Sequence, residues 1–210
     1  MKRTLIFSLS SCASVAGIAL AGIVMAQTAP KVDQAKVDSI VAATFKSAPA
    51  EWVKRIEQDE TQKLCSQFRS ELPAAERTAT LARETARVVL PADGNVMGDW
   101  KAGEKVAQTG TGGQFSDGAT TPKGGNCYAC HQLSKTELSY GTLGPSLLEY
   151  GRIRNFAAAD AKVAYAKIYN AQAVLLCSNM PRFGHNKFLT EQQMKDLVAL
   201  LFDPESPVNK

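Results

Sequence analysis

The sequence contains the stretch Cys127-Tyr128-Ala129-Cys130-His131, which is the Cys-x-x-Cys-His pattern of covalent haem attachment. Two thiols three positions apart can each form a thioether with one of the two vinyl groups of a single porphyrin. The histidine that follows then lies beneath the iron and supplies an imidazole nitrogen as the proximal ligand. The stretch therefore predicts one haem c, attached through Cys127 and Cys130 and ligated by His131.

Two other chemistries use the same cysteine spacing, and a chance match is a third alternative. A zinc site needs a second ligand pair at metal spacing, but Cys65 and Cys177 each stand alone. A thioredoxin-like redox pair needs a strand before the motif and a helix that opens at it. Residues 121–126 read Thr-Pro-Lys-Gly-Gly-Asn, which is typical of a loop. This context favours haem.

The N-terminus has the form of an export signal. Lys2 and Arg3 precede an apolar run over residues 4–25, and residues 24–26 form a small-x-small cleavage site. We therefore expect a signal peptide over residues 1–26 and a periplasmic location for the mature chain. An uncleaved membrane anchor is the alternative, because the run is nearly long enough to span a bilayer.

A second cleavage pattern lies within the same run. Leu9-Ser10-Ser11-Cys12 faintly resembles a lipoprotein cleavage box. The apolar stretch before it is short, and cleavage there would leave most of the apolar run on the mature chain. The site after Ala26 is therefore the one expected.

The charge of the mature chain excludes one class of partner. Removal of residues 1–26 takes away Lys2 and Arg3 and no acid, so the formal net charge falls from +4 to +2 before any haem propionates. Proteins that bind nucleic acid by neutralising phosphates have a larger basic excess, so nucleic-acid binding is not expected. No long apolar segment remains, so no membrane association is expected after cleavage.

Residues 27–93 predict a helical extension rather than a catalytic unit. Residues 27–48 are polar and alanine-rich with little periodicity, and a helix is expected from Pro49, capped by Ser47. Its apolar face contains Trp52, Ile56, Leu64 and Phe68. A second helix is expected over residues 74–89, with its Glu and Arg side chains outside. No acid-base or nucleophile constellation is found in this segment, so its apolar residues are expected to pack against a core.

Glycines crowd residues 94–125, within which residues 101–107 predict one short helix. The glycines permit close backbone approach, as along a haem edge, and they equally suit a flexible loop. Two longer helices follow the haem motif. Residues 158–172 predict one with Val163, Ile168, Ala164 and Ala171 inside. Thr190 and Gln193 form a capping box that opens the other, which runs to about Phe202.

Both axial sides of the haem have candidate residues. A ligating histidine usually hydrogen-bonds through its other ring nitrogen, and the carbonyl of Pro145 in the Gly-Pro turn is a candidate acceptor. The alternative for this dipeptide is a simple turn. Met180 lies in a loop rich in Pro and Gly, and its soft thioether suits haem iron as the sixth ligand. The competing candidates are Met97, Met194 and His185.

Two cysteines remain once haem attachment and signal cleavage are taken into account. Cys65 and Cys177 form an even pair in an oxidising compartment, so we predict a disulfide between them. It would tie the extension to the loop that carries Met180. The alternatives are two buried free thiols, which pack as small hydrophobes, or a bond to a partner protein.

The combined motifs resemble those of class I cytochromes c. They are the haem-attachment stretch, Gly144-Pro145-x-Leu147, Met180-Pro181-x-Phe183-Gly184 and the closing helix. This resemblance implies an all-α protein, with a class I cytochrome c-like haem domain over residues 94–210 and the helical extension before it.

A narrower resemblance is to the SoxX family of cytochrome subunits. It rests on Gly98-Asp99-Trp100-Lys101-x-Gly103-Glu104, Gln114-Phe115-Ser116-Asp117, the run 124–132 and Asn179-Met180-Pro181-Arg182-Phe183-Gly184. The resemblance implies a heterodimer with a SoxA-like cytochrome that holds the catalytic cysteine of an L-cysteine S-thiosulfotransferase. This chain would accept the electrons released when thiosulfate is joined to a SoxYZ-like carrier protein, and a small cytochrome would take them onward. A freestanding periplasmic electron carrier is the alternative function.

Overall fold

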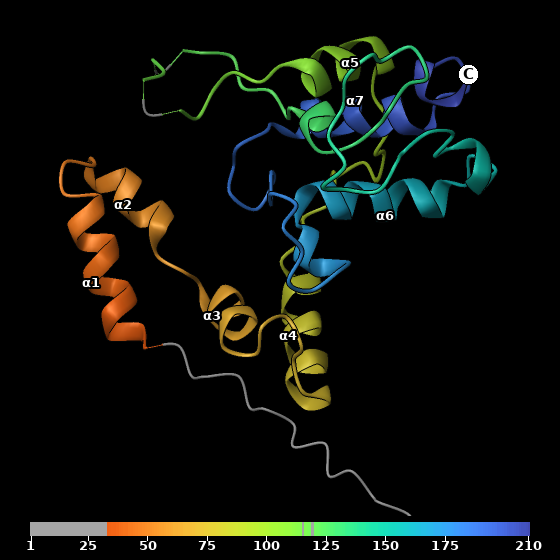
Figure 1. Cartoon of the computed structure of the whole chain (residues 1–210). Coiled ribbons are helices and arrows are strands. Elements are labelled where there is room, and N and C mark those ends of the chain that lie inside the picture. The colour runs from red at the N-terminus through yellow and green to blue at the C-terminus, as the bar shows by residue number, and fades with distance from the viewer. Residues whose placement is uncertain (1–32, 115, 119) are drawn as a thin grey trace, which may run out of the picture.

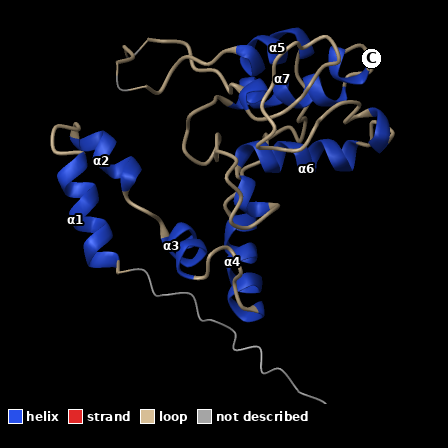
Figure 2. Cartoon of the chain, in the orientation of Figure 1, coloured by secondary structure: helices blue, strands red, loops and turns tan. Residues whose placement is uncertain are grey.

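The computed structural model describes residues 33–114, 116–118 and 120–210, and within these ranges the chain consists of helices and loops without strands (Figures 1 and 2). The all-α expectation is confirmed. The predicted signal peptide at residues 1–26 lies outside the described residues. No helix in the described part of the chain combines the length and apolar character that a membrane crossing requires.

Three helices form the predicted haem domain: α5 (Trp100–Gln108), α6 (Ala158–Tyr169) and α7 (Glu191–Phe202). α5 lies against α7, and the two helices touch at Gly103, where a Cβ atom would overlap the backbone carbonyl of Asp196 (Figure 1). The Asp196 carboxylate in turn accepts a 2.9 Å hydrogen bond from the Asp99 amide that precedes α5. Only glycine permits this close approach of the two backbones.

α7 contributes more buried apolar residues to the core than any other helix. Its buried apolar residues are Met194, Leu197, Val198, Ala199, Leu200, Leu201 and Phe202. The predicted capping box is confirmed, because Thr190 Oγ1 accepts from the Gln193 amide at 3.2 Å and Gln193 Oε1 accepts from the Thr190 amide at 3.0 Å. α6 packs on α7, with Ala164 and Ile168 buried as expected. Val163 is half exposed, so its predicted burial is wrong: the buried stripe of α6 runs through Ala161, Ala164, Tyr165 and Ile168.

Four helices precede this domain: α1 (Gln34–Thr44), α2 (Ala50–Ile56), α3 (Glu60–Gln67) and α4 (Ala74–Ala86). The apolar face predicted from Trp52 to Phe68 is divided between α2 and α3. Asp59 interrupts it, because its carboxylate accepts from the Gln62 amide at 2.8 Å and caps a new helix. Ser47 does not cap α2, which begins after Pro49 without a side-chain cap. α1 has no buried residue, which explains the lack of apolar periodicity in its sequence.

The extension contacts the haem domain through α3 and α4, whereas α1 and α2 lie apart from α5, α6 and α7 (Figure 1). α4 packs against the short turn η3 (Ala171–Ala173) that follows α6. The α1–α2 hairpin surrounds a small apolar pocket that includes Phe45, Trp52 and Ile56. The hairpin makes one hydrogen bond to the glycine-rich loop of the haem domain, in which Arg55 of α2 donates to the Gly113 carbonyl at 3.3 Å.

Candidate haem site

The attachment motif forms a tight turn directly after the glycine-rich loop. Residues Cys127–Ala129 make a 3-10 turn (η1), and the amide of His131 donates to the Cys127 carbonyl at 2.8 Å. Asn126 enters the turn in the left-handed conformation (φ 47°), which asparagine tolerates better than most residues. The thiols of Cys127 and Cys130 are free in the structure, and burial raises the pKa of the Cys127 thiol to about 12. The turn therefore presents two thiols and an imidazole within five residues.

His131 is held in one tautomer by the predicted partner. Its Nδ1 atom lies 2.7 Å from the carbonyl oxygen of Pro145. A carbonyl only accepts hydrogen bonds, so Nδ1 carries the proton and the lone pair of Nε2 is left for a metal. Gly144 packs against the ring, and a Cβ there would overlap the imidazole. The expected role of Pro145 is confirmed.

Met180 lies in a loop that is fixed at several points. Its amide donates to Ser178 Oγ at 3.2 Å, and its side chain is partly buried against the core. Gln172 holds the start of the loop, because its side chain donates to the Ser178 carbonyl at 3.1 Å and accepts from the Cys177 amide at 2.5 Å. At the far end, the Gly184 amide donates to the Tyr169 carbonyl at 3.1 Å. The loop presents a thioether from an anchored backbone.

The competing ligands occupy different surroundings. Met194 is 3% exposed and belongs to the core face of α7, as expected. Met97 is partly buried at the edge of the same core. His185 is also partly buried; burial lowers its pKa, and so do the charges of Arg182 and Arg87. Met180 as the sixth ligand stays a prediction.

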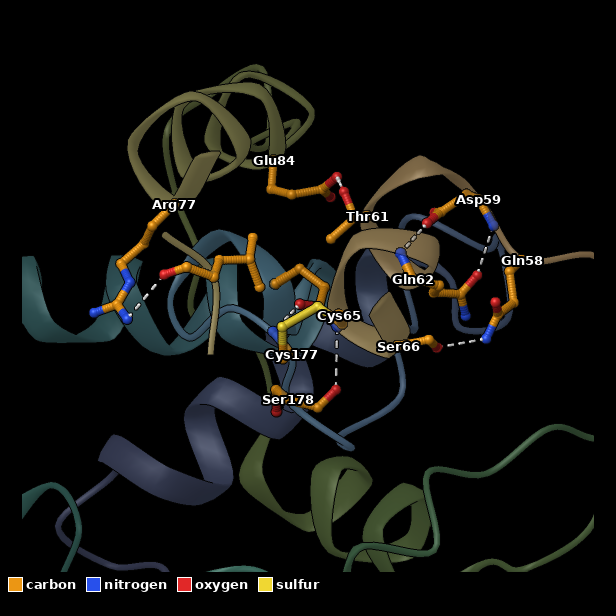
Figure 3. The surroundings of a disulfide bond; sticks show 12 residues. Gln58, Asp59, Thr61, Gln62, Cys65, Ser66, Arg77, Glu84, Cys177 and Ser178 are labelled. Atoms are coloured by element: carbon orange, nitrogen blue, oxygen red, sulfur yellow. Dashed lines mark hydrogen bonds between the residues drawn. A yellow bond between two sulfur atoms is a disulfide. The ribbon is translucent and has the colours of Figure 1, made fainter. Parts of the chain in front are cut away.

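Cys65 of α3 and Cys177 of the methionine loop form a disulfide, with their Cα atoms 5.4 Å apart (Figure 3). This is the pair expected to be bonded. Figure 3 also shows Ser178 beside Cys177 and Ser66 beside Cys65. The bond joins the extension to a residue three positions before Met180.

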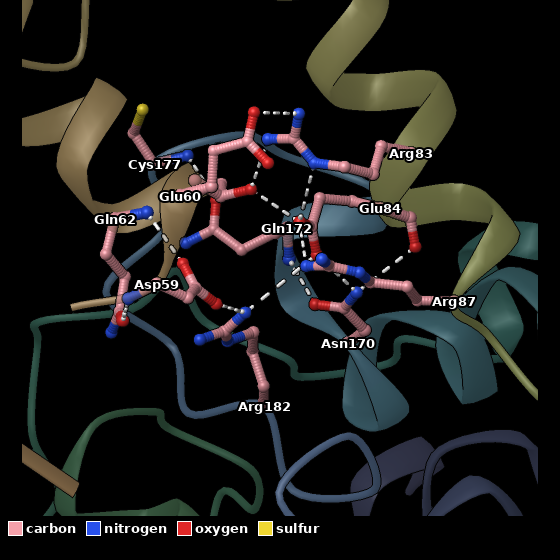
Figure 4. A network of polar contacts seen from close by, with 11 residues as sticks. Asp59, Glu60, Gln62, Arg83, Glu84, Arg87, Asn170, Gln172, Cys177 and Arg182 are labelled. Atoms are coloured by element: carbon pink, nitrogen blue, oxygen red, sulfur yellow. Dashed lines mark hydrogen bonds and ion pairs between the residues drawn. The ribbon is translucent and has the colours of Figure 1, made fainter. Parts of the chain in front are cut away.

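A buried ionic cluster beside this disulfide was not predicted (Figure 4). Glu84 on α4 is 0% exposed, contrary to the expectation that the Glu and Arg side chains of this helix lie outside. Its carboxylate lies 2.7 Å from Arg87 Nη1, and Asp59 lies 2.6 Å from Arg182 Nη1. Asn170 donates to Glu84 at 2.9 Å. No local sequence signal could have revealed it, because Asn170 and Arg182 are about a hundred residues away along the chain.

The residues present fit a covalently attached haem. Two free thiols three positions apart, an imidazole with a free Nε2 and a thioether in a loop form the donor set of a c-type cytochrome. Cys127 and Cys130 would attach the porphyrin, and His131 and Met180 would ligate its iron, which supplies one-electron chemistry. In the part of the chain that the structure describes, no three His, Cys, Asp or Glu side chains gather into an alternative metal site.

An all-helical fold with this donor set defines a haem protein of the c type. The family model for cytochrome c matches residues 101–202, so the chain contains a cytochrome c family domain. The match lies within the segment predicted to be the haem domain. It includes the attachment motif, Met180 and all three helices that form the core, apart from the first residue of α5.

A relative extends the similarity beyond this domain. An uncharacterised lipoprotein of Aquifex aeolicus (strain VF5) is 40% identical over 155 residues, which are 73% of this chain and 73% of the relative. The matched length exceeds the stretch from residue 101 to residue 210, so the similarity reaches into the extension. At least part of the extension is therefore shared with this relative.

Proposed function

We propose that this cytochrome is the electron-accepting subunit of a SoxXA-type complex. The four sequence runs that resemble SoxX carry the proposal, since they extend well beyond the haem motif. A SoxA-like partner would hold the catalytic cysteine of the L-cysteine S-thiosulfotransferase. Joining thiosulfate to the thiol of a SoxYZ-like carrier forms one sulfur–sulfur bond and releases two electrons and a proton. One haem accepts one electron at a time, so two successive transfers to a small cytochrome complete each cycle.

A freestanding electron carrier is the second candidate. It is favoured by the core cluster, all of whose buried residues lie between Val96 and Val208. The haem domain thus has an apolar core of its own. Against it stands the extension, which adds exposed apolar side chains that a lone carrier does not need: Val37, Ile40, Phe45 and Val53. These side chains lie on α1, on α2 or at the end of α1, and they are the candidate contacts for a partner protein.

Co-purification distinguishes the two candidates. We expect the holoprotein, co-expressed with a SoxA-like protein, to sediment as a heterodimer with a second haem protein. Ile40→Glu, on the exposed face of α1, should weaken the complex by about tenfold or more, as loss of an interface anchor does. Ile153→Glu is the matched control, because Ile40 and Ile153 are 55% and 65% exposed and lie on different units. Sedimentation of the wild-type protein as a monomer beside its co-expressed partner would contradict the complex.

The proposed location is outside the cytoplasm, with the chain cleaved after Ala26. The description of the Aquifex relative as a lipoprotein supports an extracytoplasmic location and adds a second candidate for the mature N-terminus, Cys12. We expect the intact mass of the native protein to correspond to a chain that begins at Gln27 and carries one haem. A mass that corresponds to a diacylated chain beginning at Cys12 would show instead that the protein is anchored to a membrane by lipid.

A further inference from the structure

We propose that Glu84 of the extension is a positioning residue for the loop that carries Met180, which it holds from both sides through Asn170 and Arg182. The inference rests on Met180 as the sixth iron ligand, as in the proposed function. It assigns to the extension a task within the haem site itself.

Glu84 is fully buried and surrounded by donors (Figure 4). Its Oε1 atom accepts from Thr61 Oγ1 at 2.5 Å and from Arg87 Nη1 at 2.7 Å. Its Oε2 atom accepts from Asn170 Nδ2 at 2.9 Å, and the same Asn170 nitrogen donates to the Glu84 backbone carbonyl at 3.1 Å. A buried carboxylate is stable only when it is paired and hydrogen-bonded, and these contacts supply both conditions.

One connection runs from Glu84 to the start of the methionine loop. Asn170, which is hydrogen-bonded to Glu84, accepts through its Oδ1 atom from the Gln172 amide at 3.3 Å. The Gln172 side chain then bonds to the Cys177 amide and the Ser178 carbonyl, as described above. Ser178 Oγ accepts from the amide of Met180. A continuous series of polar contacts therefore joins α4 to the backbone of the ligand.

A second connection reaches the loop two residues after the ligand. The Arg182 side chain is 9% exposed, and its Nη1 atom lies 2.6 Å from Asp59 Oδ2 and 3.9 Å from Glu84 Oε2. This nitrogen has no well-directed hydrogen bond among the described residues, so it is held there by charge. Arg182 is thus fixed between two carboxylates of the extension, one on α4 and one at the start of α3.

The cluster needs Glu84 in its ionised form. Burial alone would raise the pKa of Glu84, but hydrogen bonds from Thr61 and Asn170 and the charges of Arg87 and Arg182 lower it below the usual value. Replacing the carboxylate by an amide removes the negative charge that balances these two arginines. Arg182 keeps Asp59 in this variant but loses the second of the two carboxylates that hold it, so its side chain and the loop that carries it are expected to become less firmly held.

Glu84→Gln in the holoprotein tests the proposal. We expect two results: a weaker near-infrared sulfur-to-iron band, and amide hydrogen exchange of residues 178–184 that is about 10- to 100-fold faster. This range is the effect of losing a hydrogen bond to a charged group. Glu84→Asp, which keeps the charge, should partly restore both signals. Normal band intensity together with unchanged exchange in Glu84→Gln would overturn the proposal.

Glu60→Gln is the matched control. Glu60 pairs with Arg83 at 2.9 Å on the outer side of the same cluster, and it is mostly exposed. This variant should leave the band and the loop exchange unchanged, and an equal effect from it would count against a specific role for Glu84. Where Glu84→Gln does not fold, Arg182→Gln provides the test, because glutamine removes the positive charge that the two carboxylates hold and should weaken the band. An unchanged band in this variant would also overturn the proposal.

The exchange measurement separates this inference from the ligand assignment. If the wild-type holoprotein has no sulfur-to-iron band and Glu84→Gln still exchanges faster, Glu84 holds the loop but another residue ligates the iron. That result would overturn the proposal that Glu84 positions the ligand. Loss of the band in Met180→Ala together with a normal band in Glu84→Gln would support Met180 as the ligand. It would overturn the proposed role of Glu84.

Discussion

Replacing Met180 by alanine is expected to abolish the weak near-infrared sulfur-to-iron band and to lower the reduction potential of the haem by on the order of 0.1 V. A thioether favours the reduced iron, so its loss favours the oxidised state. Met180 is the candidate because it lies in an anchored loop, with its amide bonded to Ser178 and its side chain against the core. Absorption and potentiometry of the purified holoprotein measure both effects.

Two other methionines serve as controls for this substitution. Met194→Leu changes a buried residue of α7 with little change in volume, and Met97→Leu does the same at the edge of the core. Both variants should keep the band and the potential of the wild type. A band that survives in Met180→Ala but disappears in one of these variants would transfer the ligand role to that residue.

The double variant Cys65→Ser/Cys177→Ser is expected to lose about 4–5 kcal/mol of unfolding free energy in the chain-entropy model. The bond closes a loop with a sequence separation of 112 residues, and the entropy gained by the unfolded chain grows with that separation. Urea unfolding of the wild-type and variant holoproteins measures the loss. Because Cys177 begins the methionine loop, we also expect the sulfur-to-iron band of the variant to vanish at a lower urea concentration.

Ser66→Ala is the control for this variant, because Ser66 is the exposed neighbour of Cys65 and its loss should change stability by within about 0.5 kcal/mol. Mass measurement after alkylation of the denatured, unreduced wild-type protein checks the bond itself. We expect no label to be taken up, since the other two cysteines are thioethers in the holoprotein. Two labels would show free thiols at positions 65 and 177 and would remove the basis of the stability prediction.

Local sequence signals predicted the haem domain better than the extension. The capping box of α7 and the carbonyl acceptor for His131 follow from residues close together in sequence, and both are present. The break between α2 and α3 has a signal of the same kind, an Asp59-x-x-Gln62 capping box, which the apolar spacing from Trp52 to Phe68 concealed. That break could therefore have been found from the sequence.

The burial of Glu84 could not have been predicted in this way. On α4 it is one of several charged residues with helical spacing, and such residues are normally exposed. Its partners are Asn170, which precedes the methionine loop, and Arg182, which lies within it, so only the tertiary fold brings them to α4. The same holds for Gly103, whose contact with Asp196 depends on where α5 meets α7.

The four cysteines of the described chain must end in two different chemistries, and this restricts how the protein matures. Cys65 and Cys177 are joined, whereas Cys127 and Cys130 remain free thiols available to haem. If the chain is exported from its N-terminus, as the sequence predicts, the haem-attachment pair reaches an oxidising compartment before Cys177 does. Oxidation of the nearest thiols would then close a Cys127–Cys130 bond that blocks haem attachment. Maturation by this route therefore requires either a reductant that reopens this pair or haem attachment that consumes both thiols before they oxidise.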